Sequence, residues 1–96
     1  MSPRWVVSDF EWDPANVDHL WDRHQVAPDE VEEVFVGPFK MRKGRLSKGE
    51  QYYEALGPTL SGRHLFVVFL IRTQRVVRAV SARPMTKAER KWYVKP

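Results

Sequence analysis

The chain has 96 residues, a formal net charge of +4 and no cysteine. This length predicts one domain over residues 1–96. The lack of cysteine excludes a disulfide framework, thiolate metal sites and a cysteine nucleophile. The longest apolar run, residues 65–71, is far shorter than the about 20 residues that a membrane-spanning helix needs. The N-terminal residues lack the apolar stretch of a signal peptide, so we expect a cytoplasmic protein with no membrane partner.

The charge is divided unevenly along the chain. Residues 1–36 contain two basic and nine acidic residues, a balance of −7, whereas residues 37–96 contain 14 basic and three acidic residues, a balance of +11. This division predicts one acidic and one basic face on a single body. A basic face of this size attracts a polyanion and binds it independently of sequence. Solvated surface charges without a binding role are the alternative explanation.

The first third of the chain predicts a short strand and two helices. The strand starts within residues 5–12. Asp13 is a good N-cap and Pro14 suits the first position of a helix. One apolar stripe runs along that helix, made of Val17, Leu20, Trp21 and His24. A second helix follows Pro28 and ends at Gly37.

The rest of the chain predicts strands and a terminal helix. Four segments have strand character, namely residues 39–44, 50–56, 64–72 and 75–83. Residues 45–49 are a polar loop, residues 73–74 are a tight connection, and Pro84 ends the last strand. Thr86 and Glu89 are spaced as a capping box, which predicts a helix from Thr86. The order predicts an α+β fold: two N-terminal helices, an antiparallel sheet of three to four strands and a short C-terminal helix.

Several short stretches, in order and with compatible spacing, resemble one family. They are FEWDP, RH at residues 23–24, EVEEVF, GEQYY, ALGPTLSGR, VVF and RAVSARPMTKAERKWY. Together they resemble the BrnT-type toxins, the ribonuclease halves of bacterial type II toxin–antitoxin pairs, over residues 10–93. The family usually has a lysine and an asparagine where this chain has Asn16 and Leu20, and an arginine where it has Tyr52.

The resemblance implies a RelE-like fold and metal-independent cleavage of RNA, without a cofactor. It also implies neutralisation by a small ribbon-helix-helix antitoxin of the BrnA type, through which alone the protein reaches operator DNA. The histidines and acidic residues show no ligand spacing, so we expect no metal site.

Metal-free RNA cleavage needs residues that bind the phosphate and residues that move protons, because the ribose 2′-hydroxyl attacks the adjacent phosphate. Arginine suits the phosphate, since its guanidinium is always charged and matches phosphate oxygens in a bidentate way. The candidate catalytic residues are Arg72, Arg83, Glu50 and His24. The candidate RNA-binding residues are Arg78, Tyr52, Tyr53, Arg63 and Lys87.

Regular strand alternation places Arg78 and Arg83 on opposite faces of the last strand. We expect Arg83 to lie at the site with Arg72 beside it, because the strand ends there. Arg78 then pairs with Glu50 or Glu54. Tyr52 and Tyr53 likewise point to opposite faces, one toward RNA and one into the core.

Three alternatives stay open at this point. The first is that the arginines are edge or surface charges that keep the sheet soluble. The second is that Glu50 orients an arginine instead of moving a proton. The third is that His24 is a partly buried residue that caps its helix. At the level of function, the rivals to a ribonuclease are a non-catalytic co-repressor that binds the antitoxin and a free-standing RNA-binding module. Five other aromatic side chains are expected in the core, namely Trp12, Trp21, Phe35, Phe66 and Phe69.

Overall fold

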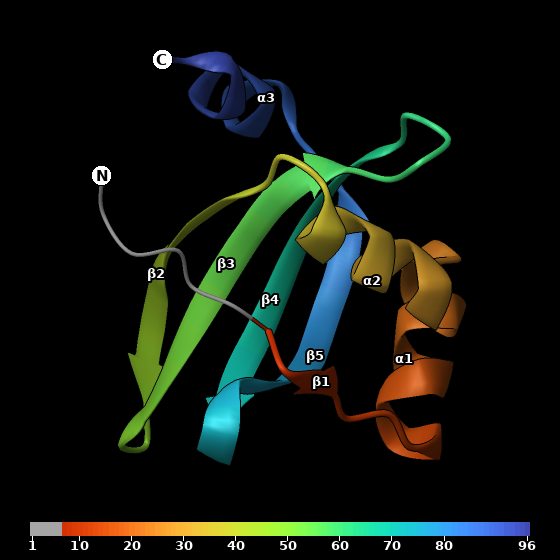
Figure 1. Cartoon of the computed structure of the whole chain (residues 1–96), viewed down its shortest axis with the longest axis vertical. Helices are drawn as coiled ribbons and strands as arrows, with labels where there is room; N and C mark the ends of the chain where they lie inside the picture. Colours follow the sequence, from red (N-terminus) through yellow and green to blue (C-terminus); the bar gives the residue numbers. More distant parts are fainter. Residues whose placement is uncertain (1–6) are drawn as a thin grey trace.

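A computed structural model describes residues 7–96, in which two helices lie on the same side of a five-stranded sheet (Figure 1). The elements in chain order are β1 (Asp9–Phe10), α1 (Pro14–His24), α2 (Pro28–Val36), β2 (Lys40–Ser47), β3 (Glu50–Pro58), β4 (His64–Arg72), a 3-10 turn (Thr73–Arg75), β5 (Val76–Pro84) and α3 (Lys87–Val94). The strands are ordered β1-β5-β4-β3-β2. None of the helices within residues 7–96 is long and apolar enough to cross a membrane.

The predicted α+β class and the order of helices and strands are confirmed, but the sheet is mixed and not purely antiparallel. Strands β2 to β5 form the expected antiparallel meander. The fifth strand, β1, pairs in parallel with the start of β5, with Asp9 opposite Val76 and Phe10 opposite Val77. Two residues that pair with a strand more than 60 positions away leave no local pattern that indicates the pairing.

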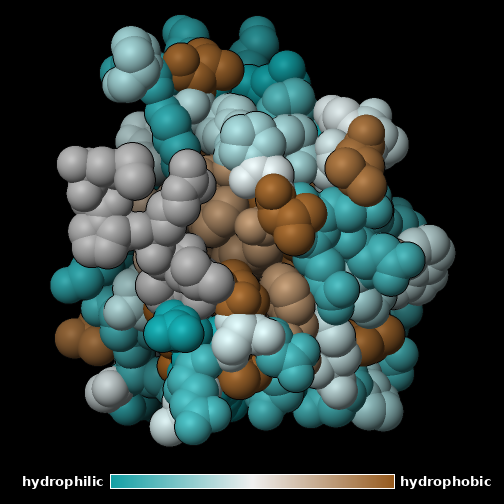
Figure 2. Space-filling model, in the orientation of Figure 1, coloured by the Kyte–Doolittle hydropathy of each residue, from teal (hydrophilic) through white to brown (hydrophobic). Residues whose placement is uncertain are grey.

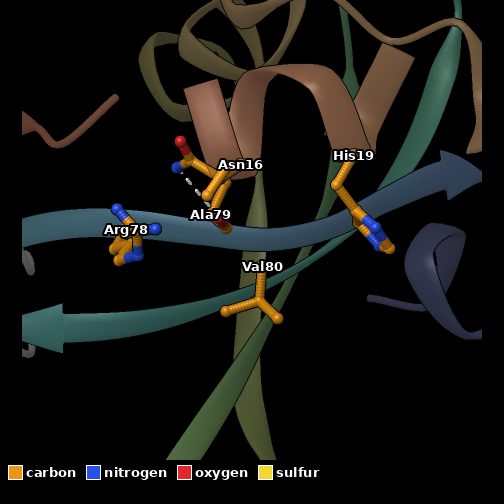
Figure 3. A pocket seen from close by; sticks show the side chains of 6 residues that line it. Asn16, His19, Arg78, Ala79 and Val80 are labelled. Atoms are coloured by element: carbon orange, nitrogen blue, oxygen red, sulfur yellow. Dashed lines mark hydrogen bonds between the residues drawn. The ribbon is translucent and has the colours of Figure 1, made fainter. Parts of the chain in front are cut away.

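The start of α1 is tied to the edge of the sheet through Asn16. Asp13 caps the helix as predicted, and Asn16 completes a capping box: its Oδ1 accepts from the Asp13 N–H at 2.9 Å. The Asn16 amide Nδ2 also donates to the carbonyl of Glu11, at 3.0 Å, and to that of Ala79, at 3.1 Å. Figure 3 shows the second of these hydrogen bonds. Asn16 is only 4% exposed, and these hydrogen bonds satisfy both polar atoms of its side chain inside the protein. The helix layer is thereby held against β5.

The hydrophobic core lies between this helix layer and one face of the sheet. It joins residues of α1, α2 and the loop between them to residues on the facing side of β3, β4 and β5: Leu20, Val26, Val31, Val34, Phe35, Ala55, Leu65, Val67, Phe69, Val77, Ala79 and Ala82. On this side of the molecule apolar residues gather beside α2 (Figure 2). Trp12 packs against the core as expected. The expectation for Trp21 is wrong, because its side chain is 54% exposed on the outer side of α1.

Strand β2 is longer than predicted, because it continues through a β-bulge into the expected loop. Lys43 lies opposite Tyr53, but Leu46 lies opposite Gln51, so Gly44 and Arg45 together oppose the single residue Tyr52. The Gln51 side-chain amide nitrogen, Nε2, lies 3.1 Å from the Gly44 carbonyl oxygen and 3.2 Å from that of Arg45. This side chain satisfies backbone oxygens that the bulge takes out of the ladder.

A second bulge in β5 overturns the predicted alternation. Val68 lies opposite Ser81 and Phe69 lies opposite Ala79, so Val80 is an extra residue. An extra residue reverses the faces of all that follows it in the strand. Arg78, opposite Leu70, and Arg83, opposite Phe66, therefore lie on the same face of the sheet, and the prediction of opposite faces is wrong.

Candidate functional site

The face of the sheet that α1 and α2 leave uncovered carries most of the charged candidates. We call it the open face, and its positions follow from the pairing of strands, since residues directly opposite each other share a face. Its polar members include Arg42, Tyr52, Glu54, Arg72, Arg78, Ser81 and Arg83. Tyr53 points the other way and packs against Phe69 of the core, so the predicted split of the two tyrosines is confirmed.

Helix α3 covers one end of the open face, which we call the α3 end (Figure 1). Its capping box is formed by Thr86 and Glu89 as predicted. The Trp92 ring packs against Arg42 of β2, whose guanidinium carbon lies 4.4 Å from the ring centroid. The Tyr93 hydroxyl donates to the Pro38 carbonyl. No residue of α3 is buried, so polar and aromatic contacts attach this helix to the sheet.

At the α3 end, Arg42 and Glu54 form an ion pair across β2 and β3. The Arg42 Nε donates to Glu54 Oε1 at 2.6 Å, and the Glu54 side chain is 22% exposed. A Cβ atom on Gly44 would lie 3.3 Å from Glu54 Oε2, so the glycine leaves room for the carboxylate beside the bulge. Arg42 was not among the residues selected from the sequence, because the pattern of residues 39–44 does not show which residue of β3 lies opposite it.

Arg83 lies at the same end and is held by α3. Its two Nη atoms donate to the two carboxylate oxygens of Glu89, each at 2.8 Å, and its guanidinium carbon lies 4.3 Å from the Phe66 ring centroid. These hydrogen bonds raise the pKa of Arg83 above its usual value; the charges of Glu89 and Glu54 add to this, and desolvation opposes it. The hydrogen bonds from Arg83 likewise lower the pKa of Glu89. Glu89 therefore stays ionised, which makes it an anchor for Arg83 and a poor proton donor.

Arg72 and Glu50 lie together at the opposite end of the open face. Arg72 Nη1 is 3.5 Å from Glu50 Oε2, and its Nε is 3.5 Å from Glu11 Oε1. Arg83 is opposite Phe66, six residues before Arg72 on β4, which separates the two arginines by about 20 Å along the strand. The expectation that Arg72 lies beside Arg83 is therefore wrong, and Glu50 is also remote from Arg83.

Arg78 pairs with the segment before α1, not with Glu50 or Glu54 as expected. Its Nη1 donates to Asp13 Oδ2 at 2.8 Å and to Glu11 Oε1 at 3.2 Å. The hydrogen bond from Arg78 is the main cause of a lowered pKa at Asp13. A hollow of about 280 Å³ lies beside this pair, between α1 and the edge of β5, with Arg78 on one side and His19 on the other (Figure 3).

The other candidates lie away from the open face, except Lys87. Arg63 donates to the carbonyls of His24, at 2.9 Å, and Gln25, at 3.0 Å, and forms an ion pair with Glu30. It thus closes the C-terminal end of α1 on the helix side of the sheet. His24 is the last residue of α1 and is half-buried in that layer. Lys87 is exposed at the first position of α3, near the Arg83–Glu89 pair.

Comparison with known proteins gives the chain a family. A family model described as "Ribonuclease toxin, BrnT, of type II toxin-antitoxin system" matches residues 12–89. The chain belongs to the BrnT family. No curated protein sequence matches it. BrnT membership makes the chain a ribonuclease toxin with a cognate antitoxin, and the matched region includes Arg42, Glu54, Arg83 and Glu89. Within residues 7–96, no group of three or more histidine and acidic side chains is arranged to hold a metal ion.

Proposed function

We propose that this BrnT chain is an endoribonuclease that needs no metal ion, and that its cleavage of RNA arrests growth. RNA lies along the open face and is cut at the α3 end, where the phosphate meets Arg42 and Arg83. The observation that carries this proposal is the bulge at Val80, which turns Arg83 onto the same face as the Arg42–Glu54 pair. Bulges beside active sites commonly re-aim a side chain in this way.

The hydrogen bonds at the α3 end leave donors for a phosphate. A guanidinium has five N–H groups. Arg83 uses three of them, two toward Glu89 and one toward the Pro84 carbonyl, while Arg42 uses only its Nε toward Glu54 within residues 7–96. The remaining donors of both arginines can bind phosphate oxygens and stabilise the charge that develops on them during attack. Fixed partners hold both side chains in place before RNA arrives.

Glu54 is the carboxylate best placed to take the proton of the attacking 2′-hydroxyl. Its Oε1 is bound by Arg42, while no hydrogen bond within residues 7–96 reaches Oε2. Glu50, selected from the sequence, is 49% exposed at the opposite end, where it pairs with Arg72. In this proposal Arg72 and Glu50 border the path of the RNA, and Glu54 replaces Glu50 as general base.

A second candidate function is favoured by the ion pairs themselves. Each of Arg42, Arg72, Arg78 and Arg83 already has a carboxylate partner, as in a surface that only maintains its own structure. On this reading the chain binds its antitoxin without cutting RNA and acts as a co-repressor. We propose a ribbon-helix-helix antitoxin in either case. Contact with DNA passes through that partner, because the six acidic residues of α1 and α2 (Asp18, Asp22, Asp29, Glu30, Glu32 and Glu33) repel a phosphate backbone from the helix layer.

Cleavage of a short RNA by the purified protein in the presence of EDTA tests the proposal. The expected result is cleavage that leaves a cyclic phosphate, and none when every 2′-hydroxyl is replaced by hydrogen, because the attacking group is then missing. An intact RNA under these conditions, together with tight binding of the antitoxin, would favour the co-repressor.

A further inference from the structure

Arg45 and Tyr52 form a cation–π pair on the open face that the ribonuclease proposal does not use. The guanidinium carbon of Arg45 lies 4.3 Å from the centroid of the Tyr52 ring. Arg45 is exposed, and no carboxylate among residues 7–96 lies within ion-pair distance of it. In this respect it differs from Arg42, Arg72 and Arg83.

The backbone around Arg45 holds the pair in place. The β2 bulge sets Gly44 and Arg45 together opposite Tyr52, whereas regular alternation would turn Arg45 toward the helix layer. The Gln51 side chain lies within hydrogen-bond distance of the carbonyls of both bulge residues, and 2.8 Å from that of Tyr52. Arg45 is thus presented on the open face by a fixed backbone, and Tyr52 supports its guanidinium from below.

A guanidinium that lies flat on an aromatic ring offers its second face to another flat group. Unstacked RNA bases are bound in this way on arginine planes and aromatic rings, and each stacked base contributes measurably to affinity. A lysine at the same position would supply the charge without the plane. Tyr52 is two residues from Glu54 on the same face of β3, so a base held here would be next to the phosphate that is cleaved.

We propose that Arg45, supported by Tyr52, is a stacking subsite for one base of single-stranded RNA beside the cleaved phosphate. The proposal rests on RNA binding at the open face. It makes Arg45 a specificity-determining residue, because purines expose more ring area to the guanidinium than pyrimidines. Gln51 positions it by fixing the bulge.

The test compares binding, without cleavage, of two fluorescent oligonucleotides of equal length. One is 2′-O-methyl oligoadenylate, and the other is the same backbone without bases. We expect the full-length wild type to bind the oligoadenylate at least about fivefold more tightly, the effect of one stacked base. Arg45→Lys, which keeps the charge, should reduce that ratio and leave affinity for the abasic chain and its salt dependence unchanged. Tyr52→Leu should reduce the ratio too, while the matched control Arg23→Lys, on the exposed side of α1, should not.

A ratio that is the same in Arg45→Lys and in the wild type would overturn the subsite. Equal loss of affinity for both oligonucleotides in Arg45→Lys would also overturn it, because that result describes a phosphate contact. This binding test is independent of cleavage. If the protein does not cut RNA but prefers oligoadenylate to the abasic chain, and Arg45→Lys loses that preference, the subsite is supported and only the proposed ribonuclease activity is refuted. Circular dichroism of each variant checks that the sheet is intact.

Discussion

Arg78 and Arg83 lie on the same face of the sheet, although five positions separate them along one strand. The cause is the extra residue Val80, which adds one step to the alternation of β5. The bulge in β2 has the same effect on Arg45. Two of the arginines of the open face therefore owe their place to backbone irregularities.

Arg63 is expected to stabilise the fold and to have no contact with RNA. Arg63→Ala removes the donors that bind the carbonyls of His24 and Gln25, which should lower the free energy of unfolding by about 1–3 kcal/mol. Arg90→Ala, an exposed arginine of α3, is the matched control and should change it by less than about 0.5 kcal/mol. Urea denaturation measures both. An Arg63→Ala protein of wild-type stability with weakened RNA binding would restore Arg63 to the RNA-binding residues.

The Arg83–Glu89 pair is expected to make stability depend on acid pH. Glu89 has a lowered pKa in the folded protein and an ordinary value of 4.5, so its contribution is present above pH 4.5 and is lost as pH falls through the folded value. Glu89→Gln should be less stable than the wild type by about 1–2 kcal/mol at pH 7. The difference between the two proteins should shrink as the pH falls below 4.5. Asp22→Asn, an exposed residue of α1, serves as the control in the same urea titrations, and a difference that is constant from pH 7 to pH 3 would contradict the assignment.

Glu54 and Glu50 are expected to differ in their effect on cleavage. Glu54→Gln removes the proton acceptor beside Arg42 and should reduce the rate by about 10²-fold or more. Glu50→Gln should retain most of the wild-type rate, because its carboxylate lies at the opposite end of the open face. Single-turnover rates on one RNA, measured with saturating protein, separate these effects from binding. The reverse order of rates would return the general base to Glu50.

The helices and their caps could be predicted because their signals are local. Asp13 with Pro14 and Thr86 with Glu89 mark the starts of α1 and α3, and Pro28 and Gly37 mark the two ends of α2. The strands of the meander could be predicted for the same reason, since each alternates or is continuously apolar. The family was also accessible from the sequence, through short stretches in the expected order.

The geometry of the site could not be predicted, because bulges and long-range pairing leave no such pattern. The residues around Val80 alternate as in any strand, and the partner strand alone determines where the extra residue falls. Strand β1 depends on a pairing with residues more than 60 positions later in the chain. The separation of Arg72 from Arg83 likewise follows from the register of β4 and β5, which local sequence patterns do not reveal.

The rate of RNA cleavage by Arg83→Ala, compared with Glu89→Gln, tests the central claim most directly. Both changes break the same ion pair, but only the first removes the group proposed to bind the phosphate. With purified, folded proteins in EDTA, we expect Arg83→Ala to cut about 10²–10³-fold more slowly than the wild type, and Glu89→Gln to lose far less. Equal losses in the two variants would show that Arg83 only anchors α3, and cleavage by Arg83→Ala at the wild-type rate would contradict the account altogether.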